Sequence, residues 1–143
     1  MTATLEQARD EITALFRAAW LADSVSSPYP ISYDDKSDPR VSSIAPWARI
    51  TVRHSFGQQH TLGGSGERVF TRTGVAIIQV FVPFGQGLLL QDRLASVARR
   101  AFEGKSTIPG NIWFTNVSVA EIGSSGAYSQ VNVTANFSYD ERV

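Results

Sequence analysis

Hydrophobic and polar positions follow a helical period from residue 5 to residue 20. Apolar side chains recur three or four positions apart along one side, and charged side chains occupy the other. The apolar positions are Leu5, Ala8, Ile12, Leu15, Phe16, Ala19 and Trp20. Thr4 and Gln7 have the spacing of an N-terminal capping box, and serine and proline take over after Asp23. The pattern predicts a helix that begins near Leu5 and ends near Asp23.

A second helical period follows the Gly-x-Gly stretch at residues 85–87. Its apolar stripe is Leu90, Leu94, Val97, Ala98, Ala101 and Phe102. Arg99 and Arg100 fall near the C-terminal end, where positive charge favours the helix dipole, and Gly104 is a natural stop. The pattern predicts a second amphipathic helix with the stripe in the core.

Two extended segments lie between these helices. Residues 47–53 alternate between apolar and polar side chains, which is typical of a half-buried strand. Residues 69–82 begin polar and become almost continuously apolar from Val75 to Val82, so we expect that half to be covered on both faces. Gly74 inside this strand predicts a bulge or a close approach of another backbone.

Two more strands are expected after the second helix, from Ile112 onward and over residues 128–139, with a Gly-Ser-Ser-Gly turn at 123–126. In the last strand one side is apolar: Val131, Val133, Ala135, Phe137 and Tyr139. The other side is polar: Gln130, Asn132, Thr134, Asn136 and Ser138. A polar side implies that one face of the sheet is open. A short extended piece is also expected at Tyr29–Tyr33.

The order of elements is helix, hairpin, helix, hairpin. Two helices cannot cover both faces of a sheet that keeps one polar face, so both should lie on the same face. We therefore predict a single domain over residues 1–143 with an α+β fold. It has two layers, with a mainly antiparallel or mixed sheet of four to five strands and a long protruding hairpin loop.

Composition and charge narrow the class of protein. The chain is 43% hydrophobic, which is ordinary for a globular domain, and it has no cysteine, which fits folding in a reducing compartment. We expect no membrane span and no secretory signal. The net charge is zero, yet residues 1–46 carry a net −3 and residues 47–82 a net +3. Such regions are either separate solvated patches or surfaces that attract one another between subunits.

Sequence signals for chemistry are weak. The glycine-rich stretch at 63–66 lacks the lysine of a phosphate-binding loop and leads into a strand instead of a helix. His54 and His60 have no third metal ligand or nucleophile assigned to them by spacing. The aspartates at 34, 35 and 38 lack the glycine and glutamate of a calcium loop. We expect no enzyme activity, no cofactor and no bound metal.

The loop of the first hairpin is longer than the usual two to five residues. We interpret it as a tip that contacts a partner, with a merely mobile loop as the alternative. The candidate contact residues are Gln58, Gln59, His60, Thr61, Gly63, Gly64, Glu67 and Arg68.

Residues 47–87 also suggest a family. A Trp-led strand, a polar loop, an Arg- and Gly-containing strand, and Val-Phe-Val-Pro before Gly-x-Gly precede a helix, and the closing strand ends in Phe-Ser-Tyr-Asp. With the first helix, this pattern resembles the tail terminator (tail completion) proteins of long-tailed phages and prophages, in the small lambda-type group. The resemblance extends over most of the chain.

The resemblance implies a small α+β subunit that forms a hexameric ring. Such a ring caps the tail tube, ends its elongation and presents a surface to the head-tail connector protein. The expected partners are therefore other copies of the chain, the tail tube protein and the connector. The expected location is the virion tail or neck, after assembly in the bacterial cytoplasm. No membrane and no specific nucleic acid are expected, although DNA passes through such a ring.

Charge suggests how identical subunits could meet. The candidate contact residues are Arg49, Arg53 and Arg72 of the hairpin on one side and Asp34, Asp35 and Asp38 on the other. Two alternatives remain: another neck or minor tail component, and a nucleic-acid-binding module that uses the hairpin arginines. The second alternative requires exposed aromatic residues between the arginines, for which Trp47 and Phe56 are the candidates.

Overall fold

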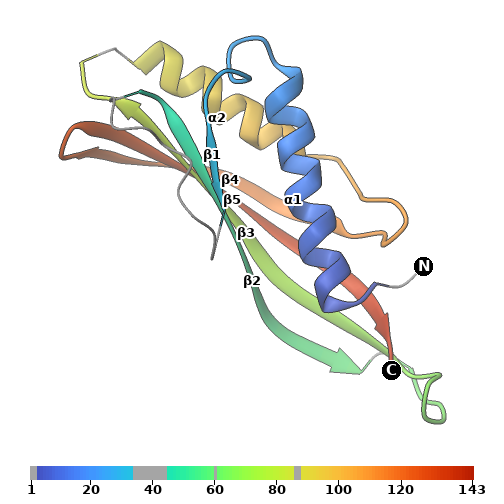
Figure 1. Cartoon of the computed structure of the whole chain (residues 1–143). Helices are drawn as coiled ribbons and strands as arrows, with labels where there is room; N and C mark the ends of the chain where they lie inside the picture. The colour runs from blue at the N-terminus through green and yellow to red at the C-terminus, as the bar shows by residue number, and fades with distance from the viewer. Residues whose placement is uncertain (1–2, 34–44, 60, 86–87) are drawn as a thin grey trace.

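The computed structural model describes residues 3–33, 45–59, 61–85 and 88–143. It has two layers, a twisted five-stranded sheet and a pair of helices that both lie on one face of it (Figure 1). The elements are α1 (Leu5–Ala22), β1 (Ile31–Tyr33), β2 (Trp47–Gln59), β3 (Val69–Pro83), α2 (Leu88–Phe102), β4 (Trp113–Ser125) and β5 (Tyr128–Arg142). The predicted α+β class, the strand number and the placement of both helices are confirmed.

The sheet has the strand order β1-β2-β3-β5-β4. The short strand β1 runs parallel to β2, and the remaining neighbours are antiparallel. The chain therefore forms two long hairpins that pair through β3 and β5 in the centre. The turn of the second hairpin is tighter than predicted: β4 continues to Ser125, and only Gly126 and Ala127 separate it from β5.

Helix α1 begins and ends where the sequence predicts. The Gln7 N–H donates to Thr4 Oγ1 at 3.2 Å, as an N-cap requires. At the other end the Val25 N–H donates to Asp23, and this bond, together with an ion pair to Arg93 of α2, lowers the pKa of Asp23. The buried stripe is Ala8, Ile12, Phe16 and Trp20. Leu5, which the pattern predicts to belong to it, is instead 49% exposed at the first position of the helix.

Helix α2 packs the predicted stripe against α1 and the sheet, and Gly104 ends it with a positive φ of 72°. The core lies between the helices and one sheet face. Its largest fully buried side chains include Trp20, Phe16, Phe102, Phe137 and Tyr139.

The expectation that β3 is covered on both faces is wrong. Ala76, Ile78 and Val80 are buried under the helices, whereas Val75 and Ile77 on the other face are only half-buried. Both helices occupy one face, so within the described residues the apolar side chains on the other face meet neighbouring strands and no covering layer. The apolar run of β3 therefore supplies one face of the core and part of an open surface.

The sequence predicts a bulge or a close approach of another backbone at Gly74, and the structure has both. Across from it the register of β2 shifts between His54 and Phe56, which marks a bulge. A Cβ on Gly74 would overlap the carbonyl oxygen of Arg53 and come within 2.5 Å of Phe137 Cζ. The close approach requires glycine here.

The helices of the described residues include none that is long and apolar enough to cross a membrane.

Candidate functional site

The first hairpin extends past the start of α1 to one end of the molecule (Figure 1). Its strands are longer than predicted, because β2 continues to Gln59 and β3 begins at Val69. Gln58 and Gln59 therefore belong to a strand and are not part of the loop. Beside the loop, Arg68 and Val143 exchange two backbone hydrogen bonds of 3.1 and 2.8 Å. The C-terminus thus anchors the base of the hairpin tip, by which we mean residues 61–68.

Every residue of the hairpin tip is exposed, and Leu62 is 94% exposed. The tip is nevertheless ordered by bonds within itself. Thr61 Oγ1 accepts from the Val69 N–H at 2.9 Å, and Arg68 Nε donates to the Gly63 carbonyl at 2.9 Å. These bonds give an exposed loop a defined shape, which a contact surface needs.

The predicted tip residues Thr61, Gly63, Gly64, Glu67 and Arg68 lie together in this loop. His60 lies outside the described residues, as do Asp34, Asp35 and Asp38.

The second feature is the sheet face that carries no helix, here called the uncovered face. Val75 and Ile77 of β3 lie at its centre. The cross-strand neighbours of Ile77 are Thr51 and Thr134, and one neighbour of Val75 is Asn136. The other neighbour of Val75 is Arg53. Apolar side chains thus alternate with polar and charged ones, a mixed surface of the kind that protein interfaces also have.

An aromatic cluster lies at the end of the uncovered face that is far from the hairpin tip. The rings of Trp47 and Phe81 stack with centroids 4.2 Å apart, and Tyr128 meets both edge-on. The guanidinium of Arg49 lies 5.1 Å from the centre of the Trp47 ring. As a result Trp47 is only 4% exposed. A ring so covered is not available to stack on a nucleotide base, which weakens the nucleic-acid alternative.

The predicted group of three arginines is divided between the two faces of the sheet. Arg49 and Arg53 pair with Gln79 and Val75 on the uncovered face. Arg72 lies on the helix-side face, where its Nε is 3.0 Å from Glu141. Side chains alternate between the two faces along a strand, so Arg72 lies on the same face of β3 as the buried Ala76. Arg53 is paired with Val75, which lies on the other face. Arg72 therefore does not share a surface with the other two.

His54 also lies on the helix-side face, with its ring edge-on to Tyr139 at a centroid distance of 5.7 Å. Both ring nitrogens are buried and have no hydrogen-bond partner among the described residues. Burial lowers the pKa of His54, the charges of Arg9 and Arg72 lower it further, and Glu141 opposes them. Burial also raises the pKa of Tyr139. His54 is therefore neutral at pH 7 and acts as a packing residue beneath the hairpin.

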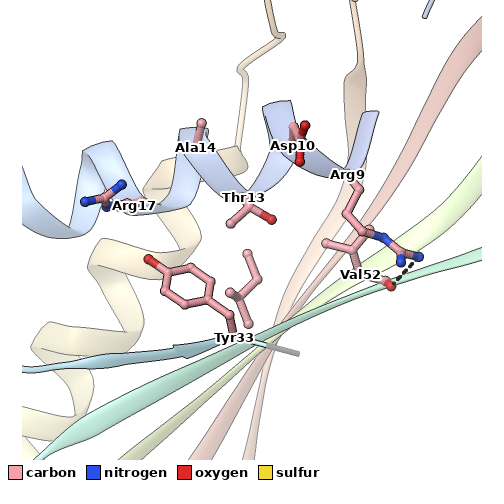
Figure 2. A pocket seen from close by; sticks show the side chains of 8 residues that line it. Arg9, Asp10, Thr13, Ala14, Arg17, Tyr33 and Val52 are labelled. Carbon is pink, nitrogen blue, oxygen red and sulfur yellow. Dashed lines mark hydrogen bonds between the residues drawn. The ribbon is translucent and has the colours of Figure 1, made fainter. Parts of the chain in front are cut away.

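A groove of about 590 Å³ lies between α1 and the strands β1 and β2 (Figure 2). Ile50 and Val52 are among the residues that line it, along with Tyr33. Arg9 reaches across from α1 and donates to the Val52 carbonyl at 3.3 Å. This bond occupies a carbonyl on the outer edge of β2 beyond the end of β1, and so protects part of that edge from pairing.

Within the ranges that the structure describes, no three His, Asp or Glu side chains gather where they could hold a metal ion. What the arrangement offers is contact: an ordered, exposed loop at one end and a partly apolar sheet face. Sequence reasoning missed the Trp47–Phe81–Tyr128 cluster. The sequence does show an aromatic residue at the start of β2, near the end of β3 and at the start of β5. Only the pairing of the strands shows that these three residues lie side by side.

Known structures resemble this fold, although no protein-family model and no curated protein matches the sequence. Twenty-eight chains of solved structures are similar to this one. One of them, a protein whose name states no function, has 15% sequence identity and a TM-score of 0.66, and the match covers 92% of this chain and 94% of that chain. At this identity the similarity supports the fold.

Proposed function

We propose that the chain is a structural virion protein that caps a phage tail tube as a ring of identical copies, ending tail elongation and forming the tail-side surface for head joining. In this proposal the ring is hexameric and lies in the tail or neck of the virion. The tail tube protein and the head-tail connector protein are its partners. The family resemblance of the sequence is the starting point, and the geometry of two surfaces supports it.

The observation that carries the proposal is the uncovered face. A five-stranded sheet keeps Val75 and Ile77 half-buried on a face that no helix covers. Apolar area left on a monomer surface is stabilised by a protein partner. A ring of identical subunits provides such a partner for every copy, since each subunit presents two different surfaces to its neighbours.

The hairpin tip supports the second half of the proposal, which is contact with the tube. It extends from the body at one end of the molecule (Figure 1), and its shape is set by its own hydrogen bonds. A loop ordered in this way loses little conformational entropy on binding. Six such tips would form one rim of the ring, and the opposite ends of the subunits would form the other.

Complementation of a phage or prophage tests the proposal. The gene for this chain is inactivated, the chain is supplied from a plasmid, and tail lengths are measured by negative-stain microscopy. We expect overlong tails without the protein and tails of one length with it. Replacing residues 62–66 by Asn-Gly shortens the tip but keeps Thr61, Arg68 and the bonds to Val143. This variant should fold and yet give overlong tails, because a capping ring needs the tip.

Glu103→Ser is the matched control, because Glu103 is exposed and lies after α2, outside the tip. It should restore normal tails. Normal infectious particles from the tip variant would show that capping does not need the tip. Tails of normal length without the protein would overturn the proposed function.

A further inference from the structure

Large apolar side chains are exposed where β3 passes into α2. Phe84 is 69% exposed, Leu88 60% and Leu89 86%. The two leucines form the first turn of α2, whereas the rest of this helix buries its apolar stripe. Leucines placed so close together on a surface mark a contact site more often than isolated ones do. They lie at the end of the sheet far from the hairpin tip (Figure 1).

A groove that fits such side chains lies between the two helices. Its volume is about 420 Å³. Small or aliphatic residues line most of it: Leu15, Ala18, Ala19, Ala22, Val97 and Ala101. Four alanines leave space that a larger side chain from outside can fill, and burying leucine there removes apolar surface from water on both sides.

The charges beside the two features are opposite. Asp92, exposed, follows Leu88 and Leu89 by about one helical turn. Arg100 and Lys105 line the groove between the helices, and the carboxylate of Asp23, which also lines it, is paired with Arg93. A docked helix start would therefore bring Asp92 toward two positive charges.

The groove between α1 and β2 is a poorer match for the same side chains. Arg9, Asp10, Thr13, Arg17 and Tyr33 contribute polar groups to its lining. Arg9 already spans it through its hydrogen bond to the Val52 carbonyl.

We infer that Leu88 and Leu89 of one copy dock into the α1–α2 groove of the next copy, with Asp92 beside Arg100 and Lys105. The two surfaces differ and lie on different parts of the subunit, so the contact is head-to-tail and can be repeated around a closed ring. This inference rests on the proposed function and adds a second subunit contact within the ring to the one that the uncovered face makes.

Sedimentation equilibrium of the full chain tests the contact. Leu89→Asp places a charge in the docked position and should weaken self-association at least about tenfold, since a buried apolar anchor commonly contributes that much. Leu89 is largely exposed in the subunit, so the variant should fold, and circular dichroism verifies this. Leu62→Asp is the matched control: it introduces the same charge at a still more exposed leucine in the hairpin tip, and it should associate like the wild type.

A charge exchange tests the direction of docking. Asp92→Arg should weaken association, Arg100→Glu with Lys105→Glu should weaken it similarly, and the three changes together should restore part of it. Unchanged association of Leu89→Asp would overturn the contact, as would a wild-type chain that stays monomeric at all concentrations. If the contact is right and the proposed function wrong, the wild type associates through Leu89 but does not restore tail length. If the proposed function is right and the contact wrong, Leu89→Asp still forms rings and restores tail length.

Discussion

Trp47 of β2 and Phe81 of β3 stack at a centroid distance of 4.2 Å and an interplanar angle of 11° on the sheet face that no helix covers. Tyr128 meets both rings edge-on, and Arg49 lies against the Trp47 ring. Among the residues that the structure describes, the pair forms a small second core outside the main one, built from side chains of the sheet. It holds the start of the first hairpin to the second hairpin.

Trp47→Ala should therefore destabilise the fold. Trp47 is 4% exposed, and deleting a buried aromatic side chain costs about 3 kcal/mol or more. The free energy of unfolding from urea titration measures the loss. Phe84→Ala is the control, because this ring is 69% exposed and its removal should change stability by only about 0.5 kcal/mol. Equal losses for the two variants would show that the stack contributes nothing beyond surface packing.

Gly74→Ala should cost about 1–3 kcal/mol, the usual range for overpacking, because the new methyl group meets the Arg53 carbonyl and the Phe137 ring. Gly64→Ala in the hairpin tip is the matched control. No atom lies within 4 Å of a Cβ built there, so this change should be neutral or slightly stabilising. Thermal unfolding of both variants gives the comparison, and a neutral Gly74→Ala would mean that the backbone at the bulge yields easily.

His54 predicts how stability depends on pH. Burial lowers its pKa in the folded chain below the usual value near 6.5, so the unfolded chain binds the proton more readily. Its contribution is fully present above about pH 6.5 and is lost as pH falls through the folded pKa. Urea titrations at about pH 7.5 and pH 5.5 should show a smaller decrease for His54→Gln than for the wild type. An identical decrease would assign the pH dependence to other groups.

Charge on the uncovered face should contribute modestly to association. Arg49 and Arg53 lie there, and exposed ion pairs contribute about 0.2–1 kcal/mol each. Self-association should therefore weaken between about 0.05 and 0.5 M salt, and Arg53→Glu should weaken it further at low salt. Arg17→Glu, an exposed change on α1, is the control. Association that responds neither to salt nor to Arg53→Glu would show that apolar contacts alone hold the subunits.

Much of the fold could be predicted because local patterns determine it. The stripe of α1, the stripe of α2 and the alternation of β5 each identify a buried side, and Gly74 was recognised from its place inside an apolar strand. The layer arrangement followed from the polar side of β5. These features depend on periodicities that a single segment contains.

Features that depend on register could not be read from the sequence. The exposure of Leu5, the one-sided burial of β3 and the separation of Arg72 from Arg53 all arise from which strand or helix lies opposite. Residues 75–82 of β3 are almost all apolar, so the sequence does not show which alternate positions of β3 face the core, and the face of Arg72 stays undetermined. The length of the tip likewise depends on how far β2 and β3 remain paired.

Capping of tube ends is the central claim, and electron microscopy of purified protein mixed with assembled tubes of the tail tube protein tests it most directly. We expect a ring of six copies bound at one end of each tube, and no further growth of that end when tube protein is added. The variant with residues 62–66 replaced by Asn-Gly should leave the ends bare. Bare tube ends with the wild-type chain, or a monomer that binds DNA and not tubes, would contradict the account.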